Sequence, residues 1–488
     1  MPVDVYVWSA VGQFRHRDAE LARLEQWWAS GDLEPLSMYG RRRVGKSWLL
    51  RRLAHGKPAV ILVADRVAPG QQLDRLARQL ERPLGVVPRI EDVADLVRVL
   101  YRLARQDKTL VVLDEFPYLL GTTAAEQQSN LSAIQAVLEQ ERDDSRIKLV
   151  LTGSTISTMQ ELQAERSPLH GRVVPFPVRP LRFAHARRLM DAADGADSLS
   201  QLTRYSVTGG MPRYLAALRG ADLAARIANQ VVDPGGGLFN EPRTLLQSEL
   251  REPAVYFSIL NTLAVRPRQA SEIGAELKMA TAELSIYLST LASLQIVSRH
   301  LPVGAARTSR STQWRCDDDF IRFWFRFVQP YQGELEAGGD PGGHVEAVVL
   351  PHLADHAELT FERTVQDWMR HKLAGQVLEV GSWWGPALHP LRARKERFSE
   401  EIDAVGIHHK NVIAVAEAKW TNKPMNASVL TDLRTFKLPA LAQAGLTAAD
   451  PRIILASRGG FTPALTELAS AAPDVELITA TDLLDELT

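Results

Sequence analysis

The chain has 488 residues, of which 45% are hydrophobic and 24% are charged, and its formal net charge at pH 7 is -1. This composition is typical of a soluble globular protein, and the length alone predicts about two to four domains. The balanced charge excludes bulk basicity as a route to nucleic acid, so any such binding must come from local patches.

The N-terminal sequence MPVDVYVWSAVGQF carries an early Asp and lacks a basic start, so we expect no signal peptide. Since no run of about 20 apolar residues occurs, we expect no membrane span and no membrane partner. The one cysteine, Cys316, excludes an internal disulfide framework and a multi-cysteine metal site. These features together predict a cytoplasmic protein.

Short apolar runs alternate with helical patterns through residues 1–180. The runs are LSMYG, AVILVA, TLVVLDE and IKLVLTGS. Buried strands of this length, separated by helices, are typical of a parallel α/β sheet. We therefore predict an α/β core in residues 1–180.

The segment GRRRVGKS, Gly40 to Ser47, matches the P-loop pattern and lies between a strand-like and a helix-like run. Gly40 and Gly45 allow backbone N–H groups to turn inward onto phosphates at a helix N-terminus. Lys46 would reach the β and γ phosphates, and the Ser47 hydroxyl would bind Mg²⁺. The sequence thus predicts ATP and Mg²⁺ as cofactors.

The run TLVVLDEF ends in Asp114 and Glu115, as expected where a buried strand emerges beside a P-loop. Asp114 would hold Mg²⁺ through water, and Glu115 would polarise the attacking water, which predicts hydrolysis. The alternative is a strand capped by two solvated acids. After the next strand, Thr152 or Ser154 can sense the γ-phosphate, or the polarity can simply serve the turn.

Residues 181–250 read as helices broken at VTGGMPRY and DPGGG. Three helical segments follow, and then two alternating runs flank a polar stretch, an order that resembles a winged helix in residues 251–330. The Gly-rich segment in residues 331–345 is the best linker candidate. Residues 346–488 then suggest a second α/β domain.

A winged helix invites a DNA-binding role, with ATAELSIYLSTL as the recognition helix and Arg299, Arg307 and Arg310 around the wing. That helix carries Glu283 and few basic residues, and phosphates would repel it. We favour a structural role as a lid on the ATPase.

The motifs GRRRVGKS, VVLDEFPYLL, LVLTGSTIS, SPLHGR and GGMPRYL, in this order, resemble the archaeal-type ATPase family. That family is a STAND-like branch of the AAA+ P-loop ATPases, and the resemblance covers residues 14–330. It implies an AAA+-like ATPase core in residues 1–180 and a helical lid in residues 181–250. The Gly-Arg pair that usually precedes the P-loop is altered, since Arg17 matches but His16 replaces the glycine.

The same resemblance implies roles for three residues outside the P-loop. Pro212 would pack near the adenine, and Arg213 or Arg172 would stabilise the departing phosphate. Arginines at the ends of strands and helices commonly pair with surface acids instead, which leaves this alternative open for both.

The stretch EEIDAVGIHHKNVIAVAEAKW reads as a hairpin with acids near the strand ends. Glu417 and Lys419 share a face because side chains alternate along a strand. If residues 409–411 make a three-residue loop with Asn411 left-handed, Asp403 lies directly opposite Glu417. Opposed Cβ atoms lie roughly 4.5 to 5.5 Å apart, which lets two carboxylates share one divalent cation.

The segment DDDFIRFWFRFVQP, residues 317–330, follows the two alternating runs of the predicted winged helix. It resembles the junction that precedes a C-terminal domain related to the PD-(D/E)XK nucleases. This resemblance implies a restriction-endonuclease-like fold, with Asp403 and Glu417 as Mg²⁺ ligands. Glu362, on a predicted helix, would complete the ligand set. Lys419 would place the attacking water, and the basic loop in residues 391–398 would either track a phosphate backbone or be solvated.

The sequence therefore predicts an ATP-binding and ATP-hydrolysing switch that controls a Mg²⁺-dependent nuclease-like domain acting on DNA. The alternative is a nucleotide-gated interaction or regulatory protein whose nuclease fold does not cut. The expected partners are DNA and either a second copy of the chain or a regulatory protein.

Overall fold

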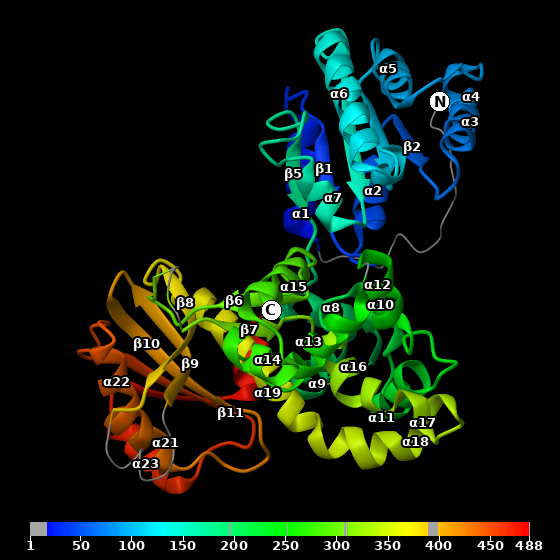
Figure 1. The fold of residues 1–488 in the computed structure, drawn as a ribbon. Coiled ribbons are helices and arrows are strands. Elements are labelled where there is room, and N and C mark those ends of the chain that lie inside the picture. The colour runs from blue at the N-terminus through cyan, green and yellow to red at the C-terminus, as the bar shows by residue number, and fades with distance from the viewer. Residues whose placement is uncertain are drawn as a thin grey trace. The chain divides into compact units, whose positions relative to one another are not determined.

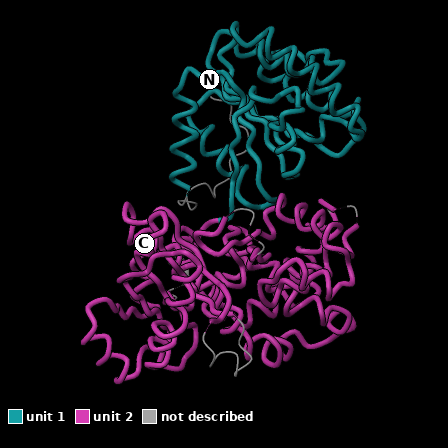
Figure 2. The backbone as a smooth tube through the Cα atoms, turned by 60° about the vertical axis from the view of Figure 1, so that its left-hand side comes forward, with its two compact units in different colours: residues 1–180 teal, residues 181–488 magenta. Residues whose placement is uncertain are grey.

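The computed structural model describes residues 17–194, 197–250, 252–306, 309, 311–388 and 399–487. The chain forms two compact units, residues 1–180 and residues 181–488, shown in teal and magenta in Figure 2. Among the described residues, none of the helices combines the length and the apolar character that crossing a bilayer requires.

Unit 1 is built on a five-stranded parallel sheet in the order β2-β3-β4-β1-β5 (Figure 1). Its strands are β1 (Leu36–Tyr39), β2 (Ala59–Val63), β3 (Thr109–Asp114), β4 (Ile147–Gly153) and β5 (Val174–Pro177). The predicted parallel α/β sheet is confirmed. Since parallel strands end at one edge, the loops after β1, β3 and β4 meet there.

The helices of unit 1 connect these strands. They are α1 (Asp18–Ala29), α2 (Lys46–Ala54), α3 (Pro69–Gln79), α4 (Glu81–Leu84), α5 (Val93–Leu103), η1 (Phe116–Leu119), α6 (Ala124–Glu141) and α7 (Ile156–Glu161). Local sequence sets their ends: Asp92 caps α5, and Thr123 with Glu126 forms a capping box at α6. Leu96 and Leu100 of α5 are fully buried in the core beside the sheet.

The first half of unit 2 is mainly helical. Its elements are α8 (Phe183–Asp194), α9 (Ser198–Thr208), α10 (Pro212–Ala217), α11 (Leu223–Ile227), η2 (Ala228–Val232), α12 (Glu241–Glu249), α13 (Pro253–Val265), α14 (Ala270–Leu277), α15 (Thr281–Ser293), β6 (Val297–His300) and β7 (Gln313–Cys316). Three helices followed by the antiparallel pair β6 and β7 match the order predicted for a winged helix. Arg307 and Arg310 lie outside the described residues, so the wing interpretation stays a prediction.

The Asp-rich junction forms the buried helix α16 (Asp319–Phe327). Its aspartates also connect α16 to the long helix α19 (Leu350–Lys372). Asp318 caps α16 by accepting a hydrogen bond from the backbone N–H of Ile321. Asp319 accepts from Arg322 of its own helix and from Arg363 of α19. This buried charge network fixes α19, which carries Glu362, against α16.

The Gly-rich segment predicted as a linker in residues 331–345 is helical. It contains η3 (Gln329–Tyr331), α17 (Gln332–Glu336), α18 (Pro341–His344) and the start of η4 (Val345–Val349), which leads directly into α19. The Asp340 carboxylate accepts from the N–H of Gly342, and Gln332 is buried and donates to Glu336. These contacts order the segment, which lies inside unit 2. Its place as a boundary between two domains of that unit stays a prediction.

A second five-stranded sheet follows, in the order β12-β11-β10-β9-β8. Its strands are β8 (Glu379–Pro386), β9 (Ser399–His408), β10 (Asn411–Lys419), β11 (Arg452–Ser457) and β12 (Val475–Thr479). The pairs among β8, β9 and β10 are antiparallel, whereas β10, β11 and β12 are parallel. The helices after β10 are α21 (Ala427–Asp432), η5 (Leu433–Lys437), α22 (Leu438–Gln443), α23 (Pro463–Ser470) and α24 (Ala480–Glu486).

The helices on this sheet pack against side chains of different size: large apolar residues beneath η5 and α22, and a glycine beside α19. Leu433 of η5 and Leu441 of α22 share one core with Val415 of β10. Near α19, the chain uses small residues: a Cβ on Gly406 would lie 3.6 Å from the Met369 Cε atom. In the same region, Gln366 of α19 donates to the carbonyl oxygen of Asp403 in β9 at 2.8 Å.

The predicted hairpin exists, but its loop differs from the prediction. Residues 409–410 form a two-residue loop, and His409, with φ +57°, takes the left-handed conformation in place of Asn411. Asn411 pairs with His408, and a register shift between Val412 and Ala414 follows. This bulge restores the pairing expected from a three-residue loop, because one extra residue moves the register by one.

Candidate functional site

The P-loop lies between β1 and the N-terminus of α2. A Cβ on Gly40 would lie 2.2 Å from the carbonyl oxygen of Val178, so a larger residue cannot fit there. Gly45 has φ +107°, a conformation that L side chains rarely adopt. Both predicted glycines are thus required by the backbone that carries the loop.

Lys46 begins α2 and turns its side chain back into the loop. Its Nζ donates to the carbonyl oxygen of Gly40 at 2.7 Å, and the residue is buried. Ser47, the next residue, is exposed. The ammonium and the hydroxyl therefore stand at the N-terminus of α2, where a phosphate is favoured.

Arg17 braces the P-loop from α1's N-terminal side. Its side chain is buried, donates from Nη2 to the carbonyl oxygen of Val44 at 2.7 Å, and pairs with Glu20. This residue is the retained half of the Gly-Arg pair noted in the sequence, and His16 lies outside the described residues. The structure gives Arg17 a positioning contact with the loop.

The acids at the end of β3 lie beside the end of β4. Burial, and then the neighbouring Glu115, raises the pKa of Asp114. Glu115 has φ +56°, and its Oε2 accepts from the Ser154 N–H at 3.1 Å and from the Ser154 hydroxyl at 2.9 Å. Of the two sensor candidates, the structure brings Ser154 to Glu115, whereas Thr152 is buried within β4.

The three residues assigned by resemblance alone have less direct support. Arg172 is 40% exposed and pairs with Glu139 of α6 at 2.5 Å, which is the surface-acid alternative. Pro212 is the first residue of α10, and Arg213 is exposed, both within unit 2. Their roles toward a nucleotide stay predictions.

The second sheet brings Asp403, Glu417 and Lys419 together near the C-terminal end of β10, away from the hairpin loop. After the bulge, Ala416 pairs with Ala404, so the next step of this register sets Glu417 beside Asp403. Asp403 Oδ2 accepts from the Ala418 N–H at 2.8 Å and lies 3.9 Å from Lys419 Nζ. Glu358 of α19 lies 3.5 Å from the same ammonium.

Charge and burial shift the pKa values of several residues in this cluster. Burial acts to lower the pKa of Lys419, but Asp403, Glu358 and the other nearby acids outweigh it and raise that pKa. Burial, followed by the charge of Asp403, raises the pKa of Glu417 to about 7. Burial and the same Asp403 charge raise the pKa of Glu362 well above its ordinary value. These groups therefore share one electrostatic site.

Glu417 also has a partner from a distant part of the sequence. Its Oε1 accepts from Lys437 Nζ at 2.6 Å, and both side chains are buried. Within the described ranges, no group of three or more His, Cys, Asp or Glu side chains is arranged to hold a metal ion. The role of Glu362, Asp403 and Glu417 as metal ligands stays a prediction.

Comparison with known proteins finds a family match for the first part of the chain. Residues 14–218 match the family described as an ATPase domain predominantly from Archaea. With the P-loop geometry, this match supports an archaeal P-loop ATPase. Residues 324–430 match a second family, described as archaeal and bacterial proteins of unknown function.

Relatives and solved structures span most of the chain. An uncharacterized protein of Methanocaldococcus jannaschii is 25% identical over 415 residues, which cover 83% of this chain and 87% of that protein. The Walker-type ATPase of Pyrococcus abyssi has a TM-score of 0.48 at 18% identity, covering 64% of this chain and 96% of that one. The ORC2 protein of Aeropyrum pernix has a TM-score of 0.42 at 15% identity, covering 69% and 97%.

Two residues of the second site, Glu358 and Lys437, were not predicted from the sequence. Glu358 precedes Glu362 by four residues on α19, so helical spacing puts both on one face. This spacing could have predicted that Glu358 belongs to the site. Lys437 lies 20 residues after Glu417, in a different element. The sequence carries no spacing rule that joins a strand carboxylate to a lysine so far along the chain.

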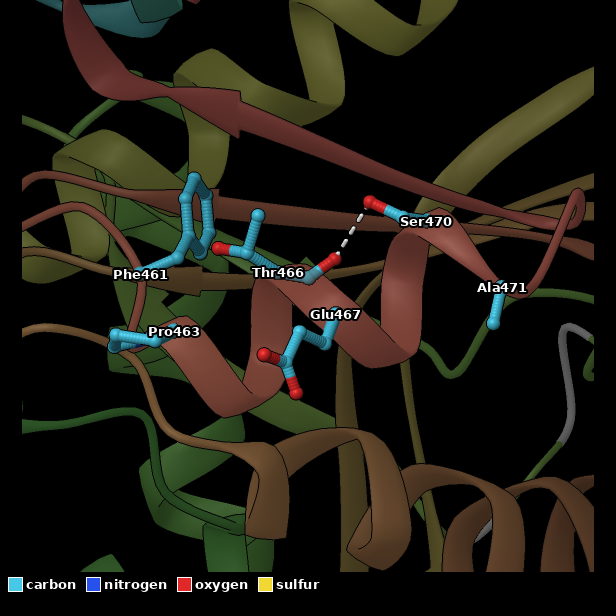
Figure 3. A pocket seen from close by; sticks show the side chains of 6 residues that line it. All are labelled: Phe461, Pro463, Thr466, Glu467, Ser470 and Ala471. Carbon is cyan, nitrogen blue, oxygen red and sulfur yellow. Dashed lines mark hydrogen bonds between the residues drawn. The ribbon is translucent and has the colours of Figure 1, made fainter.

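A separate open hollow of about 640 Å³ lies along α23 (Figure 3). Its lining is mostly small or apolar, and none of the predicted site residues belongs to it. The lining residues are Phe461, Pro463, Thr466, Glu467, Ser470 and Ala471. The hydroxyl of Ser470 is used within the helix, donating to the Thr466 carbonyl oxygen at 2.9 Å.

Proposed function

We propose that this protein is an ATP-hydrolysing switch whose nucleotide state governs a nuclease-like site acting on DNA. The first half rests on the ATPase family match and on the P-loop with its Glu115–Ser154 contact. The second half rests on one observation: Lys419 Nζ lies 3.9 Å from Asp403 in a register that sets Asp403 beside Glu417.

The P-loop residues fit a Mg²⁺-bound nucleotide. The required glycines leave the loop backbone open to phosphate, and Lys46 and Ser47 stand at the α2 N-terminus. Lys46 would hold the terminal phosphates, and Ser47 and Asp114 would hold the cation. When bound, Mg²⁺ neutralises charge on the phosphate oxygens. Glu115 would accept the proton of the attacking water, and Ser154 would keep the Glu115 carboxylate in place.

The second site supplies charge for a phosphodiester. The compact ammonium of Lys419, held by Asp403 and Glu358, can approach a phosphate oxygen or a water molecule. Carboxylate oxygens are the donors that Mg²⁺ prefers. In the described conformation, however, Glu417 is paired with the buried ammonium of Lys437, so the set does not fit a cation and we derive no step through one.

A second function has its own support. The Lys437–Glu417 pair favours a nucleotide-gated interaction or regulatory protein that retains the arrangement of a nuclease site without cutting. The net charge of -1 is also compatible with a protein partner in place of DNA.

The test is cleavage of plasmid and linear DNA with Mg²⁺ or Mn²⁺, each with and without ATP. Wild type should cut in at least one condition, whereas Asp403→Ala and Lys419→Ala should not. Lys410→Ala is the matched control, because Lys410 is exposed in the loop of the same hairpin. If wild type binds DNA and hydrolyses ATP but cuts under no condition, the interaction function replaces the nuclease function.

A further inference from the structure

Lys437 is the last residue of η5 and lies deep in the second unit. Its Nζ is 2.6 Å from Glu417 Oε1, and the two side chains are 10% and 3% exposed. Arg434, one turn earlier, makes a pair of the same length with Asp474, but those side chains are 42% and 40% exposed. Water screens the Arg434 pair, whereas the Lys437 pair acts at low dielectric.

The two lysines divide the acids between them. Lys419 lies near Asp403 and Glu358, and Lys437 contacts Glu417. Asp403 and Glu417 therefore each already face an ammonium. A divalent cation bridging Asp403 and Glu417 would have to share Glu417 with a buried positive charge.

That sharing is unfavourable for two reasons. A cation bound within a few ångströms of Lys437 would be repelled by its ammonium. If Lys437 withdrew without a replacement, the buried Glu417 carboxylate would lose its hydrogen-bonded counter-charge. The ammonium and a divalent cation thus compete for one position beside Glu417.

We propose that Lys437 is the specificity-determining residue of this site, and that its ammonium excludes divalent cations from Glu417 while the pair is formed. The inference rests on the proposed function, since it concerns the same carboxylate site. The cation-dependent cleavage expected with ATP would then require the Lys437–Glu417 pair to open. It predicts that removing this single charge, while keeping the length of the side chain, converts the site into a divalent-cation site.

The experiment is calorimetric titration of the full chain with MnCl₂ in the absence of nucleotide. Lys437→Met should bind Mn²⁺ at least tenfold more tightly than wild type at a site that wild type fills weakly. Lys437→Arg, which keeps the positive charge, and Arg434→Met, which removes a charge from the preceding turn of the same helix, should bind as wild type does. The double variant Lys437→Met with Glu417→Gln should lose the gain.

Thermal unfolding provides a second readout. Mn²⁺ should raise the Tm of Lys437→Met more than that of wild type, because a ligand that binds only the folded state stabilises it. If Lys437→Met does not fold, Lys437→Gln, whose amide can still donate to Glu417, takes its place in both measurements. Equal Mn²⁺ affinity in wild type, Lys437→Met and Lys437→Gln would overturn the inference.

The same proteins separate this inference from the proposed function. A gain in Mn²⁺ affinity without DNA cleavage by any variant supports the role of Lys437 and contradicts the nuclease function. DNA cleavage by wild type with tight Mn²⁺ binding that Lys437→Met leaves unchanged supports the nuclease and contradicts the role of Lys437.

Discussion

The Glu115 carboxylate accepts two hydrogen bonds from Ser154, one from its N–H at 3.1 Å and one from its hydroxyl at 2.9 Å. The contact joins the ends of β3 and β4 at the edge of the sheet where the P-loop lies. Glu115 also has φ +56°, an uncommon conformation for a residue with a side chain. The position of the expected general base is therefore set by its backbone and by Ser154 together.

Ser154→Ala should lower kcat for ATP hydrolysis about tenfold, about the value of one hydrogen bond to a charged group. The N–H bond to Glu115 remains, so the loss should be partial, and ATP affinity should hold. Steady-state hydrolysis and equilibrium ATP binding measure the two quantities. Ser132→Ala, on the exposed face of α6, is the control. An unchanged kcat in Ser154→Ala would show that the Ser154 hydroxyl does not contribute to hydrolysis.

Glu115→Gln should bind ATP normally and hydrolyse it about 10² to 10⁴-fold more slowly, the usual contribution of a general base. The amide oxygen of Gln can still accept from Ser154, so the side chain should keep its place. Single-turnover hydrolysis with bound ATP isolates the chemical step. Turnover at the wild-type rate would assign the base to another residue.

Lys46→Ala should abolish ATP turnover in a folded protein. The variant loses the 2.7 Å bond to the Gly40 carbonyl and the charge expected to hold the phosphates. Lys57→Ala is the matched control, because Lys57 pairs with Glu25 on the surface of the same unit. Circular dichroism should match wild type for both variants, and normal hydrolysis by Lys46→Ala would refute the assignment of the P-loop.

Glu362→Gln should stabilise the folded chain at neutral pH by about 1 kcal/mol, because the neutral amide removes the repulsion between the half-buried Glu362 carboxylate and the nearby Asp403 and Glu358. Burial raises the pKa of Glu362 above the ordinary value of 4.5. Wild-type stability is therefore fully present below pH 4.5 and falls as the pH rises through the folded-state pKa. Denaturant unfolding should show the variant gaining stability with pH relative to wild type, and a constant difference would contradict the raised pKa.

The parts of the fold and site that follow from local sequence were predictable. GRRRVGKS and TLVVLDEF each combine a strand, a turn and functional residues in one short segment, so the P-loop and Asp114 needed no tertiary information. Asp403 and Glu417 were paired correctly for the wrong reason, since a bulge near Ile413 replaced the expected longer loop. Bulges carry a weak sequence signal because they depend on packing against neighbours.

The tertiary contacts that hold the residues of both sites in place were not predictable from the sequence. Lys437 reaches Glu417 only because η5 packs against the sheet, and Ser154 reaches Glu115 only because β3 and β4 are neighbours. The helical character of residues 331–345 was hidden by glycines whose order comes from side-chain caps. The basic segment in residues 391–398 lies outside the described residues.

We propose that the nucleotide state of the P-loop governs the site formed by Asp403, Glu417 and Lys419. The most direct measurement is the rate of linear DNA cleavage in MgCl₂, with and without saturating ATP, for wild type, Lys46→Ala and Asp403→Ala. We predict cleavage by wild type that depends on ATP, and none by either variant. Cleavage by Lys46→Ala at the wild-type rate, or wild-type cleavage that is the same without ATP, would contradict the claim.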